Sequence, residues 1–100
     1  MKIELASRQD ISKAMKRILV REVRVNINPD LIADNEPLNS DRLRISSLSF
    51  IGMIMTIEDE LDITLDDEQF MKAKFITVAD LVNFVYRVYC KTHQEEEVNS

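Results

Sequence analysis

Apolar residues recur at steps of three and four in two separate segments, and this spacing restricts the fold more than any other feature. Residues 7 to 24 place theirs on one helical face behind Ser7, a candidate N-cap. Residues 78 to 89 repeat the pattern behind a Thr77–Asp80 capping box. The residues expected to face inward are Ile11, Ala14, Met15, Ile18, Leu19, Val23, Val78, Leu81, Val82, Val85, Val88 and Tyr89. Only one glycine and two prolines interrupt the 100 residues, so helices are favoured over a turn-rich sheet.

Residues 47 to 61 predict another helix, capped by Ser46 or Ser47, with apolar residues on more than one face. These residues are Leu48, Phe50, Ile51, Met53, Ile54, Met55, Ile57 and Leu61. A domain of this size cannot bury all of them, so some should face a cavity or a partner. A short helix that carries Phe70 and Met71 should follow, capped by Asp66 or Asp67.

Residues 26 to 44 predict a long loop, because Asn28-Pro29-Asp30 and Asn35-Glu36-Pro37 are typical of turns. Its expected apolar anchors are Leu31, Ile32, Leu38 and Leu43. A loop of this length in a small domain is usually functional. We expect one domain over residues 1–90 and a disordered polar tail over residues 91–100, including a solvated His93.

The charge is uneven: residues 1 to 50 sum to +2 and residues 51 to 100 to −7. The second half should therefore attract basic protein surfaces and repel nucleic acid. No apolar run approaches the roughly 20 residues of a membrane span, and residues 1 to 5 lack the apolar stretch of a secretion signal. The single cysteine, Cys90, excludes an intrachain disulfide, and we expect a cytoplasmic protein.

The residues offer no catalytic or metal site. With Cys90 as an expected packing residue and one histidine, neither a Cys/His nor a Ser/His/Asp arrangement is supported. An acidic cluster could hold a divalent cation weakly, although solvated caps and turns explain it better and no EF-hand spacing is present. The cluster consists of Asp62, Asp66, Asp67 and Glu68.

Residues 43 to 65 begin Leu-Arg-Ile-Ser-Ser-Leu, continue through an apolar stretch to Ile57-Glu58, and end on Ile63 and Leu65. This pattern resembles the acyl carrier proteins, which have Leu-Gly-x-Asp-Ser-Leu, an apolar helix, and then Leu-Glu-x-x-Phe-x-Ile-x-Ile. Residues 75 to 81 resemble the same family's start of the last helix. The resemblance covers about residues 38 to 89. It implies an all-α four-helix bundle with a long loop between helices 1 and 2 and a short helix 3.

The resemblance implies that Ser47 carries a covalent phosphopantetheine arm, on which acyl groups travel as thioesters. The protein would then have no catalytic activity of its own. Its partners would be a phosphopantetheinyl transferase and acyl-loading and acyl-processing enzymes with basic docking patches. Partner contacts would come from Leu48, Ile51, Met55, Glu58 and Asp59, whereas Met53, Ile54 and Ile57 would be core. A monomer is expected.

Three positions differ from the family pattern: Ser46 replaces the usual Asp, Arg44 replaces Gly, and Gly52 stands where Glu is frequent. An unmodified bundle that serves only as a protein-interaction module therefore remains an alternative. Gly52 could permit close approach of the loop or of a partner. A nucleic-acid binder that uses the six basic residues of segment 8–24 is disfavoured by the acidic remainder.

Overall fold

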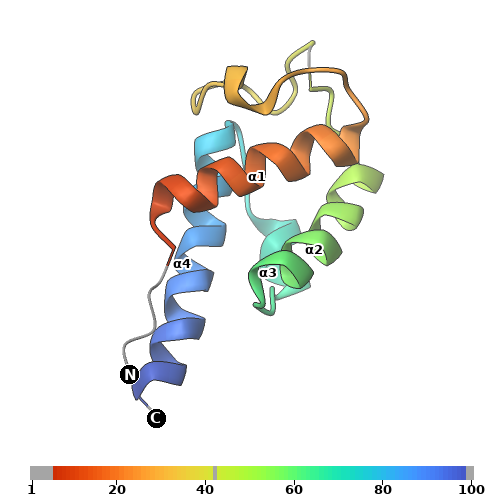
Figure 1. Cartoon of the computed structure of the whole chain (residues 1–100). Helices are drawn as coiled ribbons and strands as arrows, with labels where there is room; N and C mark the ends of the chain where they lie inside the picture. The colour runs from red at the N-terminus through yellow and green to blue at the C-terminus, as the bar shows by residue number, and fades with distance from the viewer. Residues whose placement is uncertain (1–5, 42, 99–100) are drawn as a thin grey trace.

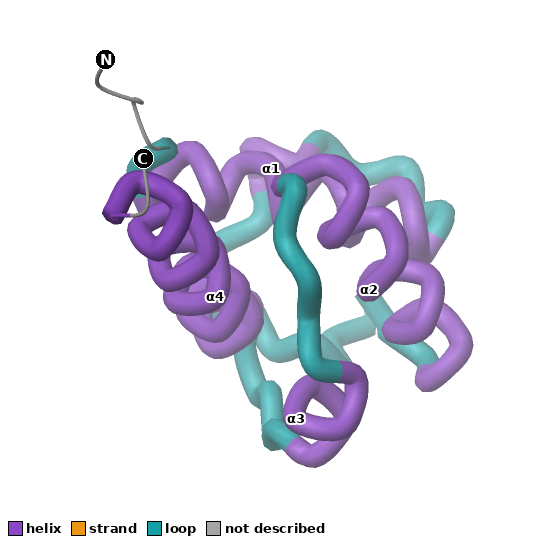
Figure 2. The backbone as a smooth tube through the Cα atoms, turned by 90° about the horizontal axis from the view of Figure 1, so that it is seen from below, coloured by secondary structure: helices purple, strands orange, loops and turns teal. Residues whose placement is uncertain are grey.

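The computed structural model describes residues 6–41 and 43–98, without the side chains of Ser47 and residues 94–98. Its helices are α1 (Arg8–Val23), the short 3₁₀ helix η1 (Pro29–Leu31), α2 (Ser47–Leu61), α3 (Asp67–Lys72) and α4 (Val78–Val98). The four α-helices surround a common interior, and α1 runs across both α2 and α4 (Figures 1 and 2). This confirms the all-α architecture, with a long loop before α2 and a short α3.

Every helix begins where a capping side chain satisfies a backbone amide of the first turn. Ser7 and Asp10 form a reciprocal box at α1, while Ser46 and Asp66 accept from Ser49 N and Gln69 N at α2 and α3. At α4, Thr77 Oγ1 accepts from Asp80 N at 3.3 Å, and the Asp80 carboxylate accepts in return from the amides of Thr77 and Ile76, both at 3.0 Å. These bonds, that of Thr77 foremost, lower the pKa of Asp80 below its ordinary value.

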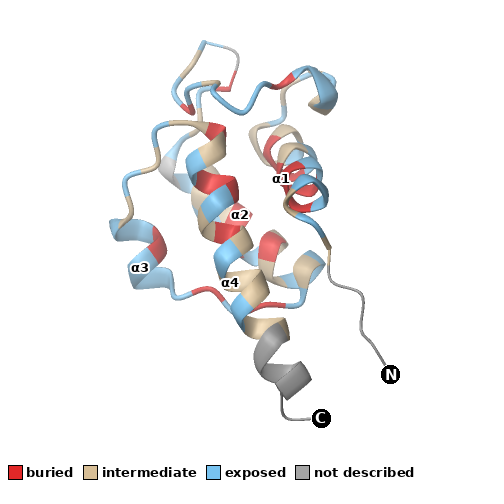
Figure 3. Ribbon diagram, turned by 90° about the vertical axis from the view of Figure 1, so that its left-hand side faces the viewer, coloured by how far each residue is buried: buried red, intermediate tan, exposed pale blue. Residues whose placement is uncertain are grey.

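One apolar cluster holds the helices together, and Figure 3 shows where its buried residues fall along them. As predicted, α1 buries Ile11, Ala14, Met15, Ile18 and Leu19, whereas Val23, also expected to face inward, is only half-buried. Likewise, α2 buries Met53, Ile54 and Ile57. The largest of the fully buried side chains is Phe70 of α3. Leu31, expected as a loop anchor, is instead 67% exposed. It closes the single turn of η1, which is too short to turn both Leu31 and Ile32 inward.

The loop before α2 is held to the start of α4 by backbone hydrogen bonds. Leu38 N donates to Ile76 O at 2.9 Å, and Val78 N donates to Glu36 O at 3.0 Å. An isolated antiparallel bridge between Pro37 and Thr77 lies among these bonds. The buried anchors Ile32, Leu38 and Leu43 fix the rest of the loop, which explains how so long a segment is ordered.

The expected disordered tail is wrong for residues 91–98, whose backbone continues α4 to Val98. Lys, Gln and Glu favour helices, and no glycine or proline ends this one. His93 is half-buried rather than solvated: its Nε2 lies 3.3 Å from Leu61 O, and its ring packs against that of Tyr89 in a tilted arrangement. Residues 99 and 100 lie outside the described residues.

None of the helices in the described residues has both the length and the apolar character needed to span a membrane.

Candidate functional site

The predicted attachment residue, Ser47, is the first residue of α2. Ser46 precedes it as the N-cap: its hydroxyl accepts from Ser49 N at 3.2 Å and lies 3.1 Å from Ser49 Oγ. The amides of Ser47 and Leu48 precede the first backbone bond within α2, so they remain available to an anion together with the positive end of the helix. The side chain of Ser47 itself is not described.

The surroundings of this helix end fit a phosphate-linked group. Ser46 is exposed and Leu48 is 79% exposed, so an attached group would meet solvent rather than packed side chains. The hydroxyls of Ser46 and Ser49 lie within hydrogen-bond distance of one another, so each of them already has a partner. A group on Ser47 would therefore place its phosphate near two free amides, with no change in the core.

The turn before α2 contains a left-handed residue. Arg44 has φ 44°, a conformation that favours glycine, and its amide donates to Ser40 O at 2.9 Å. This is the position where the resembled family has Gly. The backbone turn is thus formed without glycine, and the arginine side chain, 78% exposed, projects beside the start of α2.

Three large apolar side chains form an exposed stripe along α2. Leu48, Ile51 and Met55 follow helical spacing and are 79%, 52% and 69% exposed. Asp59, one further turn along, is exposed as well. The structure therefore leaves part of the apolar surface of α2 without a partner, as the sequence indicated.

Glu58 stabilises the fold and is also one of the acidic residues of α2 expected to contact partners. It is only half-buried, but its Oε2 accepts from Leu65 N at 2.9 Å and so holds the connection between α2 and α3. Glu60 pairs with Arg21 of α1. Of Glu58, Asp59 and Glu60, Asp59 is the one whose side chain makes neither an ion pair nor a hydrogen bond within the described part of the chain.

The absence of a side chain at Gly52 is explained by a contact with α1, not with the loop. Oε2 of Glu22 lies 2.8 Å from the position that a Cβ would take at residue 52. The other oxygen, Oε1, accepts from Thr56 Oγ1 at 2.7 Å. The absent side chain therefore makes room for a carboxylate from α1 that binds α2, and sequence analysis had no local signal for this contact.

Replacing Gly52 by alanine is expected to change stability little in the natural chain, but to stabilise a Glu22→Ala variant. Alanine favours a helix interior over glycine by about 1 kcal/mol. In the natural chain, displacement of Glu22 disturbs a hydrogen bond of about 1 kcal/mol. Urea unfolding of both single variants and the double variant measures the coupling; the same effect of Gly52→Ala in both backgrounds would contradict this explanation.

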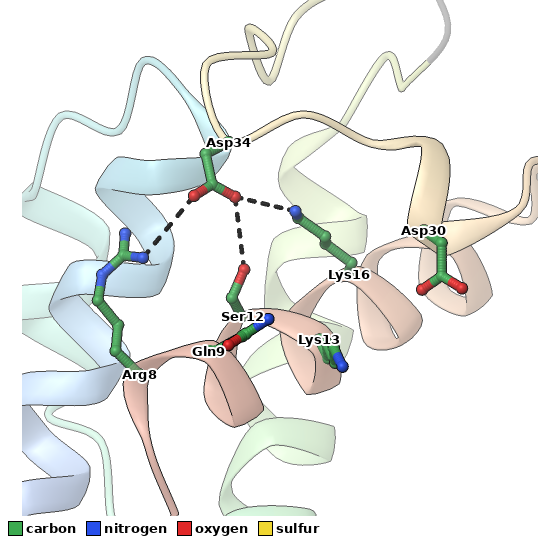
Figure 4. Close-up of a pocket in the computed structure, with 7 residues that line it drawn as sticks. All are labelled: Arg8, Gln9, Ser12, Lys13, Lys16, Asp30 and Asp34. Atoms are coloured by element: carbon green, nitrogen blue, oxygen red, sulfur yellow. Dashed lines mark hydrogen bonds and ion pairs between the residues drawn. The ribbon is translucent and has the colours of Figure 1, made fainter.

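A polar pocket lies between α1 and the long loop, with Asp34 at its centre (Figure 4). The Asp34 carboxylate lies 2.9 Å from Lys16 Nζ, and Arg8 and Ser12 approach it at 3.7 and 3.4 Å. The hydrogen bond from Lys16, with the charges of Lys16 and Arg8, lowers the pKa of Asp34 despite opposing desolvation. The cluster therefore ties the loop to α1.

A Lys16→Met substitution should raise the pKa of Asp34 towards its ordinary value. Because the folded pKa is depressed, Asp34 contributes stability above about pH 4, and this contribution is lost as the pH falls through the folded pKa. The variant should therefore lose less stability on acidification. Carboxyl NMR titration and urea unfolding at several pH values measure both effects. Lys13→Met, in the same pocket, is the control, and an unchanged Asp34 titration in Lys16→Met would contradict the assignment.

The outer surface of α1 is basic. Its acids are directed elsewhere: Asp10 caps the helix and Glu22 binds α2. Arg21 pairs with Glu60, as expected for a basic helix beside an acidic second half. Lys13, Arg17 and Arg24 have no ion pair among the described residues. Their positive charges are therefore not balanced by a paired carboxylate within the described part of the chain.

The remaining candidates carry no site. Within the part of the chain that the structure describes, no group of three or more His, Cys, Asp or Glu side chains could hold a metal ion. Cys90 is half-buried, and the influence of its thiol raises the pKa of the Tyr86 phenol. Of the acidic residues around α3, Asp66 caps the helix by accepting from Gln69 N, and Glu68 pairs with Lys72.

A small four-helix bundle with a capped, anion-compatible α2 terminus and an exposed apolar stripe beside it defines a carrier domain. Residues 13–85 match the family described as the phosphopantetheine attachment site. The chain is also 36% identical over 66 residues to an acyl carrier protein homolog of Mycoplasma genitalium, covering 66% of this chain and 74% of that relative.

The chain belongs to the acyl carrier protein family. Members of this family are carriers rather than enzymes, and phosphopantetheine, bound covalently, is the cofactor of the domain. A carrier domain acts with a transferase that attaches the cofactor and with acyl-processing enzymes.

Proposed function

We propose that Ser47 is the attachment residue and that the chain carries acyl intermediates in fatty acid, polyketide or specialised lipid biosynthesis. A transferase would bring the Ser47 hydroxyl to the pyrophosphate of coenzyme A. A new Ser47 O–P bond would form as the P–O–P bridge breaks; the hydroxyl proton is released and adenosine bisphosphate leaves. The attached arm ends in a thiol, which supplies the thioester chemistry.

The position of Ser47 at the start of α2 supports this proposal most directly. Residues 47 and 48 contribute free amides, and the helix dipole favours the negative charge of a phosphodiester. Ser46 supplies the cap that aspartate supplies in the resembled pattern, so the backbone start of α2 is kept while one negative charge is absent. The neighbouring hydroxyls of Ser46 and Ser49 are engaged with each other.

We further propose that partners dock on Leu48, Ile51, Met55, Glu58 and Asp59. The exposed apolar stripe would supply contact area, and Met55 would adapt to several partners. Asp59 would attract basic patches, with weak and salt-sensitive binding. Glu58 would add negative charge through the part of its carboxylate that the hydrogen bond from Leu65 N leaves accessible. We also propose that the protein acts as a monomer in the cytoplasm.

Intact mass tests the attachment. The purified chain is incubated with coenzyme A and a broad-specificity transferase, beside Ser47→Ala and the matched controls Ser46→Ala and Ser49→Ala. The natural chain and both controls should gain the mass of one phosphopantetheine, and Ser47→Ala should gain none. Modification of Ser47→Ala, or loss of modification in Ser49→Ala alone, would overturn the assignment.

A bundle that binds proteins without an arm is the second candidate, and two observations favour it. Arg44 and Ser46 change the charge of the surface that a transferase would read. If no transferase modifies the natural chain, while partners still bind the α2 stripe, this second function is the better account.

A further inference from the structure

All four phenylalanines of the chain meet in one cluster, although they come from four separate segments. Phe70 of α3 lies at the centre, with ring centroids 6.0, 5.1 and 5.7 Å from Phe50, Phe75 and Phe84. These are contact distances for aromatic pairs. The space between α2, α3 and α4 is therefore filled at this level by the protein's own rings, and Phe70 is only 2% exposed.

Two apolar pockets open on the outer side of this cluster and share a wall. The wall is the stacked pair Phe50 and Phe75, with centroids 6.4 Å apart and ring planes inclined by 20°. The larger pocket is about 360 Å³ and is lined by Phe50, Phe70, Met71, Ala73, Lys74 and Phe75. The smaller is about 250 Å³. Only the larger reaches the range of roughly 300–1,000 Å³ usual for small-molecule pockets, and it lies at the bottom of that range.

The pocket lies close to the start of α2. Phe50 follows Ser47 by three residues, so the two lie on the same side of the helix, about 4.5 Å apart along its axis. The pocket is therefore within reach of a group carried by a long arm on Ser47.

We propose that the pocket beside the Phe50–Phe75 wall holds a compact acyl group, by preference an aromatic one, and that long unbranched chains remain outside the bundle. This inference rests on the attachment of the arm to Ser47. An aryl ring fits the pocket in size and can stack on, or meet edge-on, the rings that line it. A long chain would have to separate rings that already contact one another, and the buried Phe70 blocks its path.

Three loaded forms test the inference: benzoyl, cyclohexanecarbonyl and dodecanoyl groups, each linked through a stable amide to the arm. Intact mass first confirms loading, because absence of added mass would overturn the attachment itself and this inference with it. The ¹H–¹³C NMR signals of the phenylalanine rings then report where the cargo lies. Benzoyl should shift the signals of Phe50 and Phe75 most, and cyclohexanecarbonyl less. Dodecanoyl should leave the signals of Phe70 and Phe84 where the unloaded arm leaves them.

A pair of matched variants separates the pocket from general packing. Phe75→Leu removes a ring from the pocket wall and should abolish most of the benzoyl-dependent shift of Phe50. Phe84→Leu removes a ring of the same cluster that does not line the pocket and should retain that shift. A dodecanoyl chain that shifts Phe70 and Phe84 more than benzoyl shifts Phe50 and Phe75 would overturn the proposal. An equal loss in both variants would do so as well.

Discussion

A Phe70→Ala variant is expected to lose about 3–5 kcal/mol of unfolding free energy, the usual cost of truncating a buried aromatic residue. Phe70 is 2% exposed and joins α3 to Phe50 of α2 and Phe84 of α4. Small domains have only about 5–15 kcal/mol in total, so the variant should be close to unfolding at moderate temperature. Urea unfolding followed by circular dichroism measures the loss.

The neighbouring methionine supplies the control for this prediction. Met71 lies on the same short helix but is 54% exposed, so Met71→Ala should stay within about 0.5 kcal/mol of the natural chain. Equal losses for the two variants would mean that α3 is sensitive to any truncation, and the central role of Phe70 would then be wrong.

The second large effect is expected on α2. An Ile51→Ala, Met55→Ala double variant should lower kcat/KM of a phosphopantetheinyl transferase roughly 30-fold, equivalent to about 2 kcal/mol of lost contact energy. Both side chains are more than half exposed, so the melting temperature should change little. Steady-state transfer rates at several carrier concentrations measure the effect.

Ile76 provides a matched control because it is 68% exposed and lies outside α2. Ile76→Ala should leave transfer unchanged if docking depends on the α2 stripe. A comparable loss in this variant, or no loss in the double variant, would remove the stripe from the docking surface.

The helix boundaries could be predicted from the sequence because capping is local. Ser7, Ser46, Asp66 and Thr77 each lie within three residues of the amide that they satisfy, so a short window contains the whole signal. The end of α4 could not be predicted in this way, because no glycine or proline marks it. Polar composition alone predicts a disordered tail, yet Gln and Glu continue a helix as readily as they form a solvated tail.

Contacts between distant segments could not be predicted. Pairing of Leu38 with Ile76 depends on where a loop returns in space. The approach of Glu22 to Gly52 depends on how α1 crosses α2, and nothing near either residue encodes it. For α2, the excess of apolar residues indicated only that some of them would be exposed. The family resemblance supplied the assignment, with Met53 in the core and Met55 outside it, and the structure buries Met53 and leaves Met55 exposed.

The helices α1 and α3 lie on opposite sides of the bundle (Figure 1). Exposed cations on α1, such as Lys13 and Arg17, and exposed carboxylates at α3, such as Asp66 and Asp67, therefore amount to a permanent electric dipole. In the field of a basic surface, such a dipole experiences a torque before contact, and the negative pole turns to the front. The carrier would thus meet an enzyme already rotated, with α1 facing away. Productive collisions would become more frequent without any gain in final affinity, and added salt would remove this advantage first.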